Sequence, residues 1–286
     1  TLASAFGAGT IPLNGTTSLS ITITNPAGNG VALSNVGFTD NLPAGLVVAT
    51  PTGLASTCGG VATATAGSSS FNLISGSVAA NASCTVTVNV RGTTTGVKNN
   101  SVQVTSTQGS SNISNASVTV VSPPTFGKAF GAASIPLGSL TSLAFTIQNT
   151  NTTQSLSGVG FTDTLPFGLL VATPNGLTGS CGGGTITATA GSGSVSLSGA
   201  TLGASGSCNF SVNVTGTTAG AKNNTTGNVT STQGGPGGTA SASVAVVAPP
   251  AIAKAFSPAT IAINGSSALT LTLTNPVANT VALTGV

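Results

Sequence analysis

Few residues in this sequence have side chains suited to acid–base or nucleophilic chemistry. The 286 residues include no histidine, two acidic residues (Asp40 and Asp163) and five lysines and arginines. General acid–base catalysis needs titratable partners, and the many serines and threonines have no base to activate them. The composition therefore predicts that the chain is not an enzyme, and it indicates no cofactor.

The four cysteines form one widely spaced pair in each half of the sequence. Cys58 and Cys84 are 26 residues apart, and Cys181 and Cys208 are 27 residues apart. A zinc site needs C-x-x-C or histidine ligands, and neither is present, so no metal site is expected. The spacing favours two disulfides, which form in an oxidising compartment. The alternative is four buried free thiols.

In the second half, three polar residues occupy strand positions that should face the core. They are a lysine, an aspartate and an asparagine. Lys128 lies two residues before Phe130, and Asp163 lies two residues after Phe161, so each shares a strand face with a phenylalanine. Asn224 is the counterpart of Asn100, which shares a strand face with Val102 and Val104. Buried side chains of these types can form a Lys–Asn isopeptide bond, because burial lowers the lysine pKa and raises the aspartate pKa.

The first half departs from this pattern, because Ser4 occupies the position of Lys128. A cross-link is therefore expected at most in the second half and around Lys254, where the pattern begins again. Two alternatives remain for Lys128. It forms an ordinary buried ion pair with Asp163, or it extends its amine to solvent at the rim of a sandwich.

The elements that position these residues are predicted to be strands. The stretch Phe-Thr-Asp-x-Leu-Pro-x-Gly-Leu, at 38–46 and again at 161–169, predicts a strand end followed by a turn. Residues 19–23 and 84–90 alternate apolar and polar side chains, which is typical of strands with one buried face. We expect about eight strands in each complete repeat and no helix.

The sequence is an internal repeat. Phe38 and Phe161 are 123 residues apart, as are Cys58 and Cys181, and Pro-Pro pairs at 123–124 and 249–250 close the two copies. We expect β-sandwich repeats at 1–124 and 125–250, and the start of a truncated third repeat at 251–286. The predicted fold class is all-β, with tandem immunoglobulin-like β-sandwich modules.

The overall composition excludes several kinds of partner. Charged residues make up 2% of the chain and its net charge is +3, without the clustered basic residues that nucleic-acid binding needs. No apolar run approaches the roughly 20 residues of a membrane-spanning helix. Hydrophobic residues nevertheless make up 39%, which predicts a folded chain.

Several motifs together resemble a known family. They are Lys-Ala-Phe-Ser-Pro-Ala-Thr-Ile at 254–261, Asn-Pro at 275–276, Cys-Gly-Gly at 58–60 and 181–183, and Ser-Cys-x-x-x-Val-x-Val at 83–90 and 207–214. With the Phe-Thr-Asp stretch, they look like the bacterial surface repeat called domain of unknown function eleven. The resemblance implies an immunoglobulin-like sandwich repeated in large secreted or cell-wall proteins, and no settled activity. Similar modules in bacterial pili carry Lys–Asn bonds.

These observations predict a structural repeat segment of a bacterial surface protein, located outside the cell. Its expected role is a stalk, surface layer or filament, with the chain itself as partner in a homopolymer or lateral assembly. A surface without strong charge offers little repulsion to such packing. The alternative is an adhesin whose loops bind a glycan or a host protein.

Overall fold

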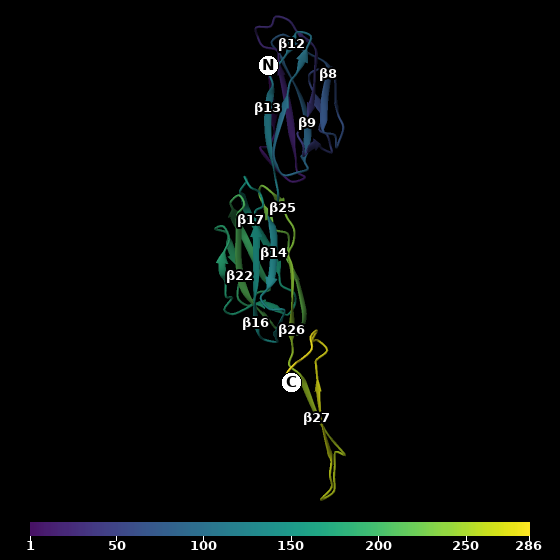
Figure 1. Cartoon of the computed structure of the whole chain (residues 1–286), viewed down its shortest axis with the longest axis vertical. Helices are drawn as coiled ribbons and strands as arrows, with labels where there is room; N and C mark the ends of the chain where they lie inside the picture. Colours follow the sequence, from purple (N-terminus) through teal and green to yellow (C-terminus); the bar gives the residue numbers. More distant parts are fainter. The chain divides into compact units, whose positions relative to one another are not determined.

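The computed structural model describes residues 1–286 and consists of strands, turns and loops (Figure 1). It contains no helix, and so none long and apolar enough to cross a membrane. The prediction of an all-β chain is confirmed. The alternating apolar residues form the longest strands, such as β3 (Thr16–Thr24) and β9 (Ser83–Gly92), whose burial also alternates.

The first repeat contains strands β1 to β13, more than the eight expected, because short two- and three-residue pairings interrupt the loops. Its strands are β1 (Leu2–Phe6), β2 (Thr10–Pro12), β3 (Thr16–Thr24), β4 (Leu33–Asn41), β5 (Leu46–Val48), β6 (Ala55–Ser56), β7 (Val61–Ala64), β8 (Ser70–Val78), β9 (Ser83–Gly92), β10 (Gly96–Val102), β11 (Thr105–Ser106), β12 (Gly109–Ser110) and β13 (Ser114–Val121).

The second repeat contains the corresponding strands β14 to β26, followed by a hairpin. They are β14 (Thr125–Phe130), β15 (Ser134–Pro136), β16 (Leu140–Gln148), β17 (Leu156–Thr164), β18 (Leu169–Val171), β19 (Thr178–Ser180), β20 (Thr185–Thr187), β21 (Ser194–Leu202), β22 (Ser207–Gly216), β23 (Gly220–Thr225), β24 (Thr230–Ser231), β25 (Gly235–Pro236) and β26 (Ser241–Val247), and the hairpin is β27 (Ala251–Ser257) with β28 (Ala268–Thr274).

Each repeat has the same arrangement of three groups of paired strands. In the first, one sheet has the order β1-β3-β9-β5, with β6 also on β9; the second has β12-β11-β4-β8-β7; the third has β10-β13-β2. The second repeat contains β14-β16-β22-β18 with β19, then β20-β21-β17-β24-β25, then β15-β26-β23. The buried side chains of the alternating strands face inward from these sheets and form the core.

The repeated Leu-Pro-x-Gly-Leu stretch is a tight turn, as predicted. In the first repeat, β4 ends at Asn41, and the amide of Leu46 donates to the carbonyl of Pro43 at 3.0 Å as β5 begins. Gly45 adopts a φ of 88°, a left-handed conformation that a residue with a Cβ rarely takes. The turn therefore sets the point at which the chain leaves the strand that carries the aspartate.

Contacts group the chain into two compact units. The first unit comprises Thr1–Pro123 together with the loop segments Thr150–Ser155 and Thr232–Gly235, and the second comprises the remaining residues. The division into repeats at 124 and 250 stays a prediction. Both strands of the β27–β28 hairpin are exposed along their whole length.

Candidate functional site

The second repeat contains a fully buried ion pair. Lys128 Nζ lies 2.9 Å from Asp163 Oδ2 and donates a hydrogen bond to Oδ1 at 3.1 Å, and neither side chain is exposed to solvent. The lysine amine also lies 6.0 Å from the ring centroid of Phe145, its cross-strand neighbour. The amine therefore lies in the core and not at a solvent-exposed rim, and a paired charge is what such a site requires.

Asn224 completes the predicted set. Its Nδ2 donates to Asp163 Oδ2 at 3.0 Å, so the lysine amine and the asparagine amide contact the same carboxylate oxygen. Asn224 is 1% exposed, whereas the neighbouring Asn223 faces solvent. The buried Oδ1 of Asn224 has no hydrogen-bond partner. The three side chains that the sequence singled out thus meet at one carboxylate, and whether a covalent bond forms there stays a prediction.

The three residues come from three different groups of paired strands. Lys128 lies on β14, Asp163 on β17 and Asn224 on β23, and no two of these strands pair with each other. Phe145 and Phe161 lie beside them, with ring centroids 5.0 Å apart. The aromatic rings exclude water from the ion pair, and the surrounding desolvation lowers the pKa of Lys128, against the opposing effect of the Asp163 hydrogen bond and charge.

The first repeat has the aspartate and the asparagine without the lysine. Asn100 Nδ2 donates to Asp40 Oδ2 at 2.8 Å, while Asp40 Oδ1 and Asn100 Oδ1 are buried without partners. Ser4, at the lysine position, instead pairs with the hydroxyl of Ser114 at 2.9 Å. Burial raises the pKa of Asp40 from 3.8 to about 6, although the hydrogen bond from Asn100 acts in the opposite direction.

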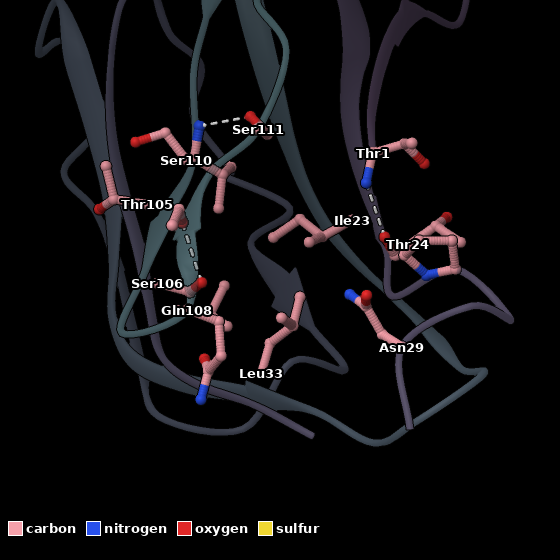
Figure 2. Close-up of a pocket in the computed structure, with 14 residues that line it drawn as sticks. Thr1, Ile23, Thr24, Asn29, Leu33, Thr105, Ser106, Gln108, Ser110 and Ser111 are labelled. Carbon is pink, nitrogen blue, oxygen red and sulfur yellow. Dashed lines mark hydrogen bonds between the residues drawn. The ribbon is translucent and has the colours of Figure 1, made fainter. Parts of the chain in front are cut away.

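A pocket of about 180 Å³ opens at one end of the first repeat (Figure 2). Asn29 lies on one side of the pocket and Gln108 on the other, with Ile23 and Leu33 between the two sides. No acidic or basic side chain lines it. Sequence reasoning did not identify this pocket, because its walls come from strands and loops that are far apart in the chain.

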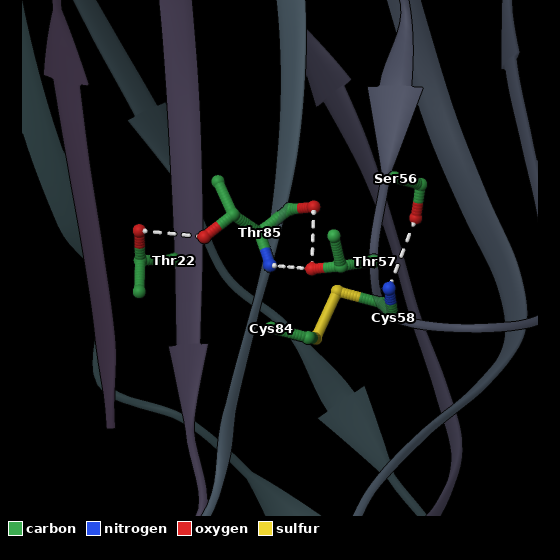
Figure 3. Close-up of a disulfide and its surroundings, with 6 residues drawn as sticks. All are labelled: Thr22, Ser56, Thr57, Cys58, Cys84 and Thr85. Carbon is green, nitrogen blue, oxygen red and sulfur yellow. Dashed lines mark hydrogen bonds between the residues drawn. A yellow bond between two sulfur atoms is a disulfide. The ribbon is translucent and has the colours of Figure 1, made fainter.

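Both cysteine pairs are bonded in the structure, and no cysteine is free. Cys58 follows the short strand β6 and joins Cys84 of β9 across Cα atoms 4.9 Å apart (Figure 3). Beside the bond, the amide of Thr85 donates to Thr57 Oγ1 at 2.9 Å, and the amide of Thr57 donates to the carbonyl of Thr85 at 3.0 Å. Cys181 and Cys208 form the corresponding bond in the second repeat.

Two further lysines are buried, which sequence reasoning did not foresee. Lys98 and Lys222 are 8% and 6% exposed, and their amines donate to Thr94 Oγ1 at 2.7 Å and to Thr218 Oγ1 at 2.8 Å. A Cβ on Gly45 would lie 2.6 Å from the Lys98 amine, so the amine packs against the repeated turn. Recurrence of the lysine at the same place in both repeats was the available signal.

Comparison with protein-family models gives one description. The family model "Domain of unknown function (DUF7933)" matches residues 1–120 and 124–246, one match to each repeat. The predicted resemblance to domain of unknown function eleven is not confirmed by this match. No curated protein shows significant sequence similarity to the chain.

Two solved structures with a similar fold are C-terminal domains of streptococcal polypeptides. The C-terminal domain of the AgI/II polypeptide BspA from Streptococcus agalactiae has a TM-score of 0.51 at 11% identity, covering 86% of this chain and 99% of that one. The C-terminal domain of the antigen I/II-family protein AspA from Streptococcus pyogenes has a TM-score of 0.51 at 11% identity, covering 86% and 98%. At this identity the likeness concerns the fold, and it confirms the prediction of immunoglobulin-like β-sandwiches.

Proposed function

We propose that this chain, which belongs to the DUF7933 family whose model matches both repeats, is a structural segment of a secreted bacterial surface protein. In this role it forms part of a stalk, surface layer or filament outside the cell. The observation that carries the proposal is the buried set Lys128, Asp163 and Asn224. Its chemistry faces the core of the repeat, so it acts on the repeat itself and not on an external substrate.

The proposed reaction is formation of a Lys128–Asn224 isopeptide bond. The neutral Lys128 Nζ attacks Asn224 Cγ, so that a C–N bond forms and the Cγ–Nδ2 bond breaks. Asp163, which contacts both nitrogens, passes the lysine proton to the departing nitrogen, which leaves as ammonia. Desolvation favours the neutral amine that the attack requires.

Such a bond would join β14, the first strand of the second repeat, to β23, near its end. A pulling force applied at the two ends of the repeat would then bypass the residues between 128 and 224. It would therefore limit how far the repeat extends when pulled, and the Cys181–Cys208 disulfide lies inside the bypassed segment. A stalk that resists extension is the function that this arrangement supports best.

Tryptic mass spectrometry of the purified chain tests the proposal. Trypsin cleaves after Lys128 and Lys222, so an unlinked chain releases a peptide covering 129–222. With the bond, cleavage after Lys128 is blocked, and residues 99–222 stay joined to the peptide that carries Asn224. The joined product is about 17 Da lighter than the sum of its sequences, through loss of ammonia.

Matched variants locate the reaction. Asp163→Asn keeps the shape of the side chain but removes the proton relay, and it should restore cleavage after Lys128 and the full mass. The first repeat, with Ser4 at the lysine position, is an internal control that should keep its full mass. A full-mass second repeat in the unaltered chain would reduce Lys128–Asp163 to an ordinary buried ion pair.

One observation favours a second candidate function, an adhesin that binds a glycan or a host protein. Phe167, at the tip of the turn between β17 and β18, is 87% exposed, although most phenylalanines were expected in the core. An exposed aromatic ring on a loop is suited to stacking against a sugar. Screening the chain and Phe167→Ala on a glycan array tests this candidate, which requires binding that the variant loses.

A further inference from the structure

The loop that follows β3 and the loop that follows β28 have the same sequence pattern and the same internal bonds. Asn29 Nδ2 donates to Asn25 Oδ1 at 2.9 Å, and Asn279 Nδ2 donates to Asn275 Oδ1 at 2.7 Å. The amide nitrogen of each second asparagine also donates to the carbonyl of the proline three residues earlier, at 2.9 Å in both loops. The two loops therefore present their second asparagine in the same way.

Asn279 holds a backbone segment with its side chain. The amide of Ala248 donates to Asn279 Oδ1 at 2.7 Å, and Asn279 Nδ2 donates to the carbonyl of Ala248 at 2.9 Å. Ala248 is the residue immediately before the second Pro-Pro pair. The asparagine side chain thus imitates a neighbouring peptide group, with one donor and one acceptor.

The same pair of bonds occurs at the first Pro-Pro pair. The amide of Ser122 donates to Asn151 Oδ1 at 2.8 Å, and Asn151 Nδ2 donates to the carbonyl of Ser122 at 2.9 Å. Ser122 and Ala248 have different side chains, so the recognition depends on the backbone. Each is also the last residue able to donate a backbone hydrogen bond before two prolines, which lack the N–H.

A second feature marks where the Pro-Pro segment packs. A Cβ on Gly234 would clash with the carbonyl oxygen of Ser122 and lie 2.7 Å from Pro123 Cα, so the segment passes directly over this glycine. Gly234 follows a Val-Thr-Ser-Thr-Gln run that recurs before Gly109. A Cβ on Gly109 would have open space around it, and Gly109 lines the same pocket as Asn29.

We propose that Asn29 and the pocket beside it are a docking site for the end of a further copy of this repeat, namely an extended backbone segment X-Pro-Pro. The amide of Asn29 would pair with the N–H and C=O of residue X, and the prolines would lie over Gly109. This inference rests on the proposed structural role, to which it adds a partner and a contact. It does not depend on the isopeptide bond.

The test uses the full chain extended before Thr1 by Val-Val-Ser-Pro-Pro, which repeats the sequence before Thr125. Amide hydrogen exchange measured by NMR reports on the added serine N–H. We expect Asn29→Ala to accelerate its exchange by roughly tenfold, the effect of losing one net hydrogen bond. Asn115→Ala, an exposed asparagine on β13, is the matched control and should leave the rate unchanged.

A second arm of the experiment keeps Asn29 and changes the extension instead. An extension of Val-Val-Pro-Pro-Pro removes the donor of residue X, and the NMR signals of the Asn29 side-chain amide should then return to their positions in the unextended chain. Asn151→Ala provides an internal standard, because it should accelerate exchange of the Ser122 N–H.

The same spectra contain the result that would overturn the inference. It fails if Asn151→Ala accelerates exchange at Ser122 while Asn29→Ala leaves the added serine unaffected. It also fails if the Asn29 amide signals are the same with both extensions. Neither result changes the tryptic mass of the second repeat, so failure of the docking site is distinguishable from failure of the proposed cross-link.

Discussion

At the scale of single residues, the two repeats use one aspartate position in two ways. Asp163 is paired with the Lys128 amine, whereas Asp40 is buried with one hydrogen bond, from Asn100, and no cation. A buried carboxylate without a cation is disfavoured relative to its protonated form. Because serine stands at the lysine position of the first repeat, the Asp40 carboxyl is buried without a counter-charge.

This difference predicts an unusual pH dependence for the first repeat. Because the pKa of Asp40 is raised from 3.8 to about 6, the folded state binds the proton more tightly than the unfolded state between these pH values. Protonated Asp40 therefore stabilises the folded first repeat. This contribution is fully present below pH 3.8 and is lost as the pH rises through 6. The full shift corresponds to about 3 kcal/mol.

Denaturant unfolding at a series of pH values, followed by hydrogen exchange in the first repeat, measures this effect. We expect the first repeat to unfold at lower denaturant concentration at neutral pH than at pH 4. Asp40→Asn keeps the shape of the side chain without the charge, and it should flatten the dependence over this window. A first repeat that is equally stable across the window would contradict the prediction.

At the scale of elements, each disulfide joins two parts of a sheet. One cysteine follows a short edge strand, and the other lies in a long central strand. Strand β6 contains two residues, and the chain after it is held to β9 by the Cys58–Cys84 bond and by the Thr57–Thr85 hydrogen bonds (Figure 3). So short a strand has little pairing of its own. The covalent bond therefore determines whether this stretch stays against the sheet.

We expect the double variant Cys58→Ala, Cys84→Ala to lose about 3 kcal/mol of unfolding free energy in the first repeat, the chain-entropy value for a loop of this size. Denaturant unfolding measures the loss, and the second repeat, which keeps its own bond, is the control.

In the unaltered chain, alkylation without reductant should modify no cysteine. Modified thiols there would contradict both the bonds and the inferred oxidising compartment.

At the scale of the whole molecule, the surface has almost no charge to oppose association. The entire chain contains two acidic and five basic residues. Three of the five basic residues are not free on the surface, because Lys98 and Lys222 are buried and Lys128 is paired with Asp163. The β27–β28 hairpin also exposes Leu269, Leu271 and Leu273 on one face, between 48% and 58%. Exposed strand edges and apolar rows favour pairing with another chain.

We therefore predict self-association that depends little on salt. Light scattering of a concentration series should show the same degree of assembly at low and at physiological ionic strength, because both acidic side chains are buried and the surface has no pair of oppositely charged side chains to be screened. Leu271→Lys in β28 should reduce assembly by introducing a charge into the exposed row. A chain that stays monomeric at high concentration, or that dissociates on adding salt, would contradict this prediction.

The sequence by itself determined the longer strands, the turns and the internal repeat, because these depend on local patterns. Alternation with a period of two showed which side chains face the core. It placed Asn224 at a core-facing position, and Lys128 and Asp163 on the faces of core phenylalanines. The spacing of the cysteines likewise singled out the two pairs that the structure shows bonded.

Only the tertiary structure decided which of these faces meet. Lys128 and Asn224 contact one oxygen of Asp163 because of the way three separate groups of strands pack together. No local sequence pattern specifies this packing. The same holds for the burial of Lys98 and for the Asn279 side chain on the Ala248 backbone. An exposed loop asparagine has many local conformations, and its partner is set by the distant segment that the fold brings beside it.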